Sequence, residues 1–362
     1  MVEKRVVEPT GSGALALFFG QPLFDMTANA SEELLAQYGI RDGSVGPATP
    51  EQLPIFEQLL NEEDTTYYGG GSAMNAGRTM KWVSPETDVC CVGSVGCDEF
   101  CEVFTRTMDE AGVHYLLEYH EDSPTGTCVA LIVNKERAMR ANLGAANKIT
   151  LEYMKSAPIQ RAIKKAMLFY TEGFFLNTVS SPENVLLLAE HAHKEGKLFC
   201  FNLNAPFVSL LFGERLKVLL PFIDILFGGR EDFTAFGTMM WGDEVGSDID
   251  AVLMRTVGLP KNNSSRSRLV VATCGADPTL VAMKHRVTAY EVPEVDKAQI
   301  VDLTGAGDCF VGGFLAQYLS CPDIQLCVEA GHAAAAVVIR HWGTRLSGDP
   351  PQLKTRNGEF VC

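Results

Sequence analysis

One carboxylate in this sequence stands directly behind a run of small residues, in the stretch DLTGAGDCFVGGF at residues 302–314. Gly305, Ala306 and Gly307 carry no bulky side chains, and apolar residues then recur at helical spacing, so Asp308 lies in the first turn of a predicted helix. Backbone N–H groups at a helix start attract anions. The pattern suggests a phosphate site with Asp308 as a base; an ordinary helix cap, which contributes about 1 kcal/mol, is the alternative.

Other polar side chains could hold a hydroxylated ligand. Asp25 follows the first predicted strand in GQPLFDMTA, residues 20–28, where α/β folds bind ligands, and it could grip two ribose hydroxyls. Ser72 and Asn75 follow glycines in YYGGGSAMNAGRTM, residues 67–80, and could hydrogen-bond a polyol. The alternatives are a solvated turn aspartate for the first stretch and a capped helix packed tightly on a sheet for the second.

Three basic side chains are candidates for contacts with a phosphate donor. Arg137 and Arg140 lie in NKERAMRANLGAAN, and one of them could reach over a phosphate and neutralise its charge. His332 leads a run of small residues in GHAAAAVVIRHWG, where a flat base could lie against the alanine face. Surface arginines and a structural histidine are the alternatives.

The elements that must position these residues form two patterns. From about residue 165 the chain alternates strand-like segments (MLFYTEG, KLFCFNL, FIDILFG) with helix-like ones (SPENVLLLAEHAHKEG, SLLFGERLKVLL). Strands that are apolar along most of their length are typical of a parallel sheet covered by helices on both faces. This half is therefore predicted to be a doubly wound α/β domain, with GLPKNNSSRSR, residues 258–268, as a mobile surface loop.

The N-terminal part shows short alternating stretches between turns, such as PLFDMTANA, TTYYGGG and GTCVALIVNKERAMRANL. They indicate half-exposed antiparallel strands. These strands form either a small sheet that covers a cleft or an edge extension of the main sheet. The first possibility divides the chain into a large domain (about residues 10–22, 72–114 and 146–362) and a discontinuous lid (about residues 23–71 and 115–145).

Composition and net charge restrict the kinds of partner and the compartment that fit this protein. The chain has 362 residues, 46% of them apolar, and a net charge of −15, so it can fill a sizeable core and its field repels polyanions. Eleven cysteines without a C-x-x-C pair fit a reducing compartment. No signal peptide or membrane-spanning run is apparent. We expect a cytoplasmic protein, monomeric, with small-molecule ligands rather than nucleic acid or membrane as partners.

Two common nucleotide motifs do not apply. GSGALA, residues 11–16, matches G-x-G-x-x-A, but a polar tail precedes it and a strand follows, which is the wrong context for a dinucleotide fold. No G-x-x-x-x-G-K-[ST] occurs, so a P-loop is excluded. A phosphate donor would have to bind in another way.

Taken in order, the motifs resemble those of the ribokinase-like (PfkB) carbohydrate kinases, and within them the branch that acts on adenosine. The matching segments run over most of the chain: GQPLFDMTA, GGGSAMNAG, PTGTCVALIVNKERAMRANLGAAN, EGFFLNTVSSPENV, FNLNAPF, DILFG, DLTGAGDCFVGGF and AGHAAAAVVIRHWG. The resemblance implies a mostly parallel central sheet flanked by helices, with a small β-sheet lid. It implies transfer of a phosphoryl group from Mg-ATP to the 5′-hydroxyl of adenosine, giving AMP.

The resemblance also implies roles for individual residues. Asp308 becomes the base, Arg137 the lid arginine at the transferred phosphate, and Gly305, Ala306 and Gly307 an anion hole. The implied nucleoside contacts are Gln21, Leu23, Asp25, Gly70, Gly71, Ser72, Asn75, Cys128, Met139, Ala141, Phe175, Asn204 and Phe207. The implied ATP contacts are Thr273, Gly275, Thr304, Gly307 and His332, and Mg²⁺ would lie near Glu231 and Asp232.

Three positions depart from the family pattern. After DILFG the family has an N-x-x-E motif that supports the metal, whereas this chain has Gly229 and, three residues on, the shorter Asp232, with Arg230 adding a positive charge. Gln21 replaces an asparagine after the first strand, and Leu303 and Thr304 precede the anion hole. These changes would affect the metal arrangement, the choice of nucleoside or the rate. They leave two alternatives to an active kinase for adenosine: a nucleoside-binding relative with little kinase activity, suggested by Gly229 and Arg230, and a kinase for another nucleoside or sugar, suggested by Gln21.

Overall fold

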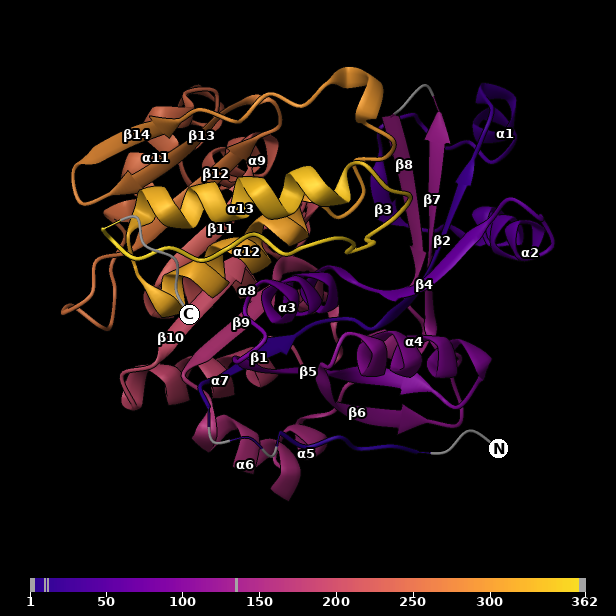
Figure 1. The fold of residues 1–362 in the computed structure, drawn as a ribbon, viewed down its shortest axis with the longest axis horizontal. Coiled ribbons are helices and arrows are strands. Elements are labelled where there is room, and N and C mark those ends of the chain that lie inside the picture. The colour runs from indigo at the N-terminus through magenta and orange to yellow at the C-terminus, as the bar shows by residue number, and fades with distance from the viewer. Residues whose placement is uncertain (1–3, 10, 12, 134–135, 358–362) are drawn as a thin grey trace.

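The computed structural model describes residues 4–9, 11, 13–133 and 136–357. Among them, nine strands form one large sheet that is parallel from β12 to β6 and antiparallel at the β13–β14 edge (Figure 1). In spatial order these strands are β14 (Arg286–Tyr290), β13 (Asp277–Met283), β12 (Leu269–Cys274), β11 (Ile225–Gly229), β10 (Leu198–Asn202), β9 (Leu168–Glu172), β1 (Leu15–Phe19), β5 (Asp88–Gly96) and β6 (His114–His120).

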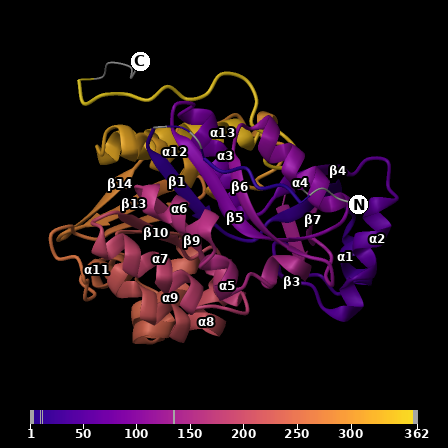
Figure 2. The same ribbon diagram turned by 90° about the horizontal axis from the view of Figure 1, so that it is seen from below.

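Helices cover both faces of this sheet, and Figure 2 shows the two layers with the strands between them. One face packs against α3 (Ser72–Val83), α4 (Glu99–Glu110), α12 (Ala306–Ser320) and α13 (Ile324–Val338). The other packs against α5 (Leu151–Met154), α6 (Ala157–Lys165), α7 (Glu183–Lys194), α8 (Pro206–Leu219), α9 (Arg230–Trp241) and α11 (Ile249–Val257), and α10 (Asp243–Gly246) lies beside α9. None of the described helices is long and apolar enough to span a membrane.

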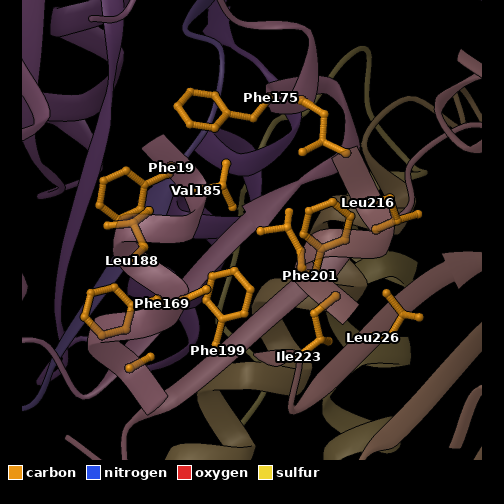
Figure 3. Close-up of a cluster of buried hydrophobic side chains, with 14 of the residues drawn as sticks. Phe19, Phe169, Phe175, Val185, Leu188, Phe199, Phe201, Leu216, Ile223 and Leu226 are labelled. Atoms are coloured by element: carbon orange, nitrogen blue, oxygen red, sulfur yellow. The ribbon is translucent and has the colours of Figure 1, made fainter. Parts of the chain in front are cut away.

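Alternation along the strands builds a core on each side of the sheet. In β1, Ala16 and Phe18 point to the α3–α12 side, and Leu17 points to the α6–α9 side. Figure 3 shows the second core, where Phe169 and Phe201 from neighbouring strands are fully buried among leucines and valines. Each buried aromatic side chain of this kind contributes roughly 1.5–3 kcal/mol, so the two cores fix the sheet whose strand ends form the site.

A second sheet stands apart from the first, in the order β3-β8-β7-β2-β4. Its strands are β2 (Leu23–Asn29), β3 (Val45–Pro47), β4 (Thr66–Gly70), β7 (Gly126–Val133) and β8 (Glu136–Asn142), with α1 (Glu32–Gln37) and α2 (Pro54–Leu60) alongside. Its own apolar cluster includes Phe24, Met26, Leu59 and Val129. The predicted fold class, a doubly wound sheet with a separate small sheet, is confirmed, and the edge-extension alternative is wrong.

Two details of the sequence prediction are corrected. The small sheet is mixed rather than antiparallel, because β2 pairs parallel with β7, and β3 pairs parallel with β8. Strand β6, residues 114–120, pairs with β5 in the large sheet, although the second segment of the predicted lid, about residues 115–145, included it. Strand β7 is buried along its whole length, so local alternation did not reveal its pairing.

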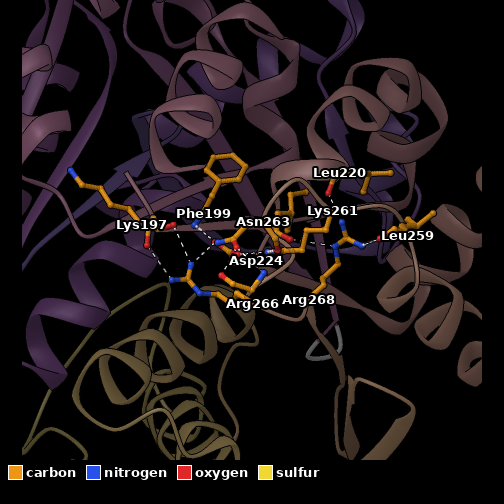
Figure 4. A network of polar contacts seen from close by, with 12 residues as sticks. Lys197, Phe199, Leu220, Asp224, Leu259, Lys261, Asn263, Arg266 and Arg268 are labelled. Atoms are coloured by element: carbon orange, nitrogen blue, oxygen red, sulfur yellow. Dashed lines mark hydrogen bonds and ion pairs between the residues drawn. The ribbon is translucent and has the colours of Figure 1, made fainter. Parts of the chain in front are cut away.

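The predicted mobile loop at residues 258–268 is instead tied to the core (Figure 4). The buried carboxylate of Asp224 accepts from Lys261 Nζ at 2.6 Å and from Arg266 Nη1 at 3.0 Å. Arg268 is 1% exposed, and its guanidinium donates to the backbone carbonyls of Leu220, Ile223, Thr256, Leu259 and Pro260. Polar composition predicted a solvated loop, but these cations satisfy buried acceptors.

Replacement of Arg268 tests this reading. Arg268→Met leaves buried carbonyls without a donor, so we expect urea denaturation to show a loss of about 3 kcal/mol in unfolding free energy. The matched control is Arg286→Met on the exposed edge strand, which should change stability by less than about 0.5 kcal/mol. Equal effects of the two substitutions would contradict a structural role for Arg268.

Candidate active site

A cavity of about 990 Å³ opens where the carboxyl ends of the central parallel strands meet the small sheet. Ligands of open α/β sheets bind at this edge, because loops from several strands converge there. Most of the predicted site residues line the cavity: Gln21, Leu23, Asp25, Gly71, Ser72, Asn75, Cys128, Arg137, Met139, Ala141, Asn204, Phe207, Asp232, Thr273, Gly275, Thr304, Gly305, Ala306, Gly307, Asp308 and His332. Gly70, Phe175, Glu231 and the departing Arg230 do not line it.

Asp308 is held by two side chains of helix α3. Ser72 Oγ donates to Oδ1 at 2.6 Å, and Asn75 Nδ2 donates to Oδ2 at 3.1 Å. Asn204 Nδ2 in turn donates to Ser72 Oγ at 2.7 Å, which orients the hydroxyl proton toward Asp308. Helix α12 has Gly305 at its N-cap and Asp308 as its third residue, so the helix-cap alternative is wrong.

Loss of solvation raises the pKa of Asp308 to about 6, and the bonds from Ser72 and Asn75 together with the Arg137 cation oppose this rise. The carboxylate is therefore ionised at neutral pH and gains its proton below about pH 6. A base with this pKa is charged when substrate binds at neutral pH. Its pKa is closer to 7 than that of an ordinary aspartate, so it accepts a proton more readily.

The loop before α12 is fixed by Asp302. One of its oxygens accepts from the N–H and hydroxyl of Thr304 at 2.8 and 2.7 Å, and the other accepts from the Gly343 N–H at 2.9 Å. Gly305 adopts a left-handed φ of 76°, which favours glycine at the turn into the helix. Gly305, Ala306 and Gly307 line the cavity at the start of α12, where the N–H groups of a first helical turn can bind an anion. The Ala306 N–H donates to the Leu303 carbonyl oxygen at 3.3 Å.

Arg137 links the small sheet to this loop. It comes from β8, and its Nη1 donates to the carbonyl oxygen of Leu303 at 3.0 Å. The guanidinium therefore lies beside the loop that leads into α12, and its contact with a transferred phosphate stays a prediction. Arg140, the other arginine of that segment, instead bonds to Ser44 and Gln52 within the small sheet.

Asp25 lies on β2, where it is buried and lines the same cavity as Asp308. Burial, followed by the charge of Asp308, raises its pKa to about 8, although a hydrogen bond from the Gly71 N–H opposes this rise. A Cβ on Gly70 would lie 1.8 Å from Asp25 Oδ2. Gly70 is thus required for the packing of Asp25 rather than as part of the cavity wall.

An apolar end of the cavity lies beyond Asp25. Leu23, Cys128 and Met139 pack together there, and Phe207 stacks on Phe174 with ring centroids 5.8 Å apart. Phe175, which the sequence assigned to this wall, is fully buried and points into the core instead (Figure 3). The two neighbouring phenylalanines point in different directions from the short 3₁₀ turn after β9.

The other end of the cavity is formed by α13 and the β12–β13 turn. His332 is buried, Thr279 Oγ1 lies 2.9 Å from its Nε2, and the Phe310 ring lies against it at 5.5 Å between centroids. Burial lowers the pKa of His332, so the imidazole is neutral at neutral pH. His332 is therefore both a packed histidine and part of the wall.

The segment that departs from the family pattern is only partly in the cavity. Asp232 lines it, accepts from the Gly229 N–H at 2.6 Å, and has its pKa raised to about 6 mainly by burial. Glu231 and Arg230 are exposed and lie outside the cavity lining, because they occupy other faces of the first turn of α9. Arg230 acts on the thiol of Cys274, between the lining residues Thr273 and Gly275, so the effect of its charge on a metal site stays a prediction.

Sequence reasoning missed several wall residues, chiefly Phe174, Glu172 and Asn202. Glu172 and Asn202 end β9 and β10, so the rule that selected Asp25, a polar residue at the carboxyl end of a strand, would have found them. Phe174 had no local signal, because an aromatic pair in a turn does not indicate which ring is buried.

This fold, with a large, mostly parallel sheet flanked by helices and a second smaller sheet, is that of the ribokinase-like kinases. The chain belongs to the pfkB family of carbohydrate kinases, whose family model matches residues 46–351.

Individual relatives are all similar over nearly full length. Adenosine kinase 2 of Arabidopsis thaliana is 34% identical over 333 residues, covering 91% of this chain and 94% of that protein. Adenosine kinase of Dictyostelium discoideum is 33% identical and covers 92% and 97%.

Solved structures agree with these relatives. The crystal structure of Anopheles gambiae adenosine kinase in complex with P1,P4-di(adenosine-5) tetraphosphate has a TM-score of 0.85 at 33% identity, covering 90% of this chain and 95% of that one. Adenosine kinase from Schistosoma mansoni in complex with 2-fluoroadenosine has a TM-score of 0.87 at 26% identity, covering 95% and 99%.

The two phenylalanines after β9 give a direct test of the corrected assignment. Phe175→Ala empties a core site and should lower the unfolding free energy by about 3–5 kcal/mol. Phe174→Ala, at the half-buried cavity wall, should lower it by less than half of that amount. A larger loss for Phe174→Ala in urea denaturation would mean that the rings are placed the other way round.

Proposed function

We propose that this protein transfers the γ-phosphoryl group of ATP to the 5′-hydroxyl of adenosine, forming AMP and ADP. The observation that carries the proposal is the Asp308 carboxylate, held by Ser72 and Asn75 at the head of a helix whose first residues line the same cavity. Relatives named adenosine kinase, similar over nearly their whole length, support the choice of adenosine.

The cavity supports binding of the nucleoside between its apolar end and Asp25. The Phe174–Phe207 pair and the Leu23–Met139 cluster offer flat apolar surfaces for a purine. Burial keeps the Asp25 carboxyl largely uncharged below about pH 8, so it has both a donor and an acceptor for two ribose hydroxyls. These contacts would direct the 5′-carbon toward Asp308.

Phosphoryl transfer then depends mainly on positioning and charge. Asp308 accepts the proton of the 5′-hydroxyl as the new phosphorus–oxygen bond forms and ADP leaves. Because the transition state is loose, its charge lies largely on the phosphoryl oxygens. The N–H groups at Gly305–Gly307 and the Arg137 guanidinium are the groups suited to stabilise those oxygens. ATP would occupy the end of the cavity lined by Thr273, Gly275 and His332.

The family also implies Mg²⁺, and the residues present fit an ion that arrives with the nucleotide. Among the described residues no group of three or more histidines, cysteines or acidic side chains could hold a metal. Mg²⁺ commonly needs only one or two carboxylates besides substrate phosphates, and Asp232 supplies one in the cavity wall. When bound there, the ion would neutralise phosphate charge; Glu231 lies outside the cavity wall and is not part of this proposal.

The proposal is tested by ATP-dependent turnover over a panel of nucleosides and sugars. We expect adenosine to be the fastest substrate. In Asp308→Asn, kcat should fall by at least roughly 10², because the amide cannot accept the hydroxyl proton, while thermal unfolding stays close to that of the parent. The control is Asp64→Asn, an exposed aspartate whose loss should leave kcat within about twofold.

Two results would contradict the proposal. Faster turnover of ribose or inosine than of adenosine would assign another substrate to this site. Near-full activity of Asp308→Asn would remove Asp308 as the base.

A further inference from the structure

Glu172 is a buried acid in the cavity wall for which the proposed mechanism has no use. It ends β9, is 1% exposed, and lines the same cavity as Asp308. Neither of its carboxyl oxygens has a hydrogen-bond partner among the described residues. Buried carboxyl oxygens nearly always have partners in folded proteins, so this exception needs a reason.

The packing around Glu172 offers few hydrogen-bond donors to its carboxyl oxygens. On one side the chain passes so close that a Cβ on Gly20 would lie 3.0 Å from Oε1. On the other side Ser72 has a single hydroxyl proton, which it already gives to Asp308. Asn204 donates to Ser72. Ser72, Asn204 and the Ala73 N–H lie close enough to Glu172 to oppose part of the rise in its pKa, but none of them makes a hydrogen bond of standard geometry to its carboxyl oxygens. The two side chains nearest to Glu172 are thus engaged in holding Asp308.

The charged and titratable groups that face Glu172 are Asp308 from α12, Tyr170 from β9 itself and Cys91 from β5. Burial raises the pKa of Cys91 to about 12 and the pKa of Tyr170 well above its usual range, so both are neutral at neutral pH. The Arg137 cation acts on Asp308. Of these three groups, only the carboxylate of Asp308 is therefore charged at neutral pH.

We propose that Glu172 is a positioning residue of the phosphoryl-transfer site: held as an uncharged acid, it keeps Asp308 the only anionic carboxylate at this end of the cavity. Ionised Glu172 would put a second negative charge beside the base and the incoming phosphate. The kinetic part of this inference rests on the proposed kinase function.

The pH range follows from the environment of the acid. Burial, followed by the charge of Asp308, raises the pKa of Glu172 from its ordinary value of 4.5 to about 8. Glu172 is then neutral where Asp308, with its pKa near 6, is already ionised. At saturating substrates, kcat should fall as pH rises above about 8. Asp25 titrates in a similar pH range. Its protonation state would affect the affinity for the nucleoside, and this effect does not enter kcat when adenosine is saturating.

The kinetic test compares the parent with Glu172→Gln, which fixes the neutral state in nearly the same shape. The measured quantity is the ratio of kcat at about pH 9.5 to kcat at about pH 7.5, so absolute rates drop out. We expect the ratio to fall to about 0.2 or below in the parent and to stay above about 0.5 in Glu172→Gln. Equal ratios in the two proteins would overturn the proposal.

A second measurement needs no turnover. Because folding favours the uncharged form, the folded protein loses stability as pH rises from about 4.5 to about 8, and Glu172→Gln avoids this loss. The melting temperature of Glu172→Gln minus that of the parent should therefore grow by about 2 °C or more over this range. The control is Glu214→Gln, whose side chain is 89% exposed, and its difference should stay flat.

These two readouts separate the two proposals. A parent that does not phosphorylate adenosine at any pH would contradict the proposed function, while the melting-temperature difference would still report the state of Glu172. A melting-temperature difference that does not change with pH would show that Glu172 is not held neutral, and would overturn the inference whatever the enzyme's activity.

Discussion

The site depends on the hydrogen bonds by which Ser72 and Asn75 hold Asp308, residues more than two hundred positions apart in the chain. They fix the start of α3 to the start of α12, whose packing is among the most extensive between helices of the large domain. Gly71, with a φ of 100°, lets β4 of the small sheet turn directly into α3. The same junction therefore places the base, the small sheet and the anion site together.

Burial of several carboxyls in one cavity is the electrostatic consequence of this junction. Asp25, Glu172 and Asp308 all have pKa values above their ordinary range, mainly through loss of solvation. Ionising all three in a poorly solvated space would cost much free energy. Their different surroundings therefore give them different pKa values. Asp308 has the most hydrogen-bond donors and Arg137 nearby, and it therefore ionises at the lowest pH of the three.

Much of this could be predicted from the sequence, because the informative residues are local. A glycine run before Asp308 and apolar strands covered by helices each follow from short-range rules. What failed were features set by tertiary contacts: Phe174 rather than Phe175 in the wall, β6 in the large sheet, and the buried cations of the 258–268 loop. The position of Glu172 at the end of β9 could have marked it as a wall residue, but its closeness to Asp308 is set by tertiary contacts.

The central claim is that Asp308, held ionised by α3, is the base, and the most direct test is the acid limb of kcat/KM in the parent and in Ser72→Ala. The Ser72 hydroxyl lowers the pKa of Asp308, so its removal should move the limb from about pH 6 to higher pH. Titration of the nucleotide is common to both enzymes and does not affect the difference. A limb at the same pH in both, or one shifted to lower pH, would contradict the account.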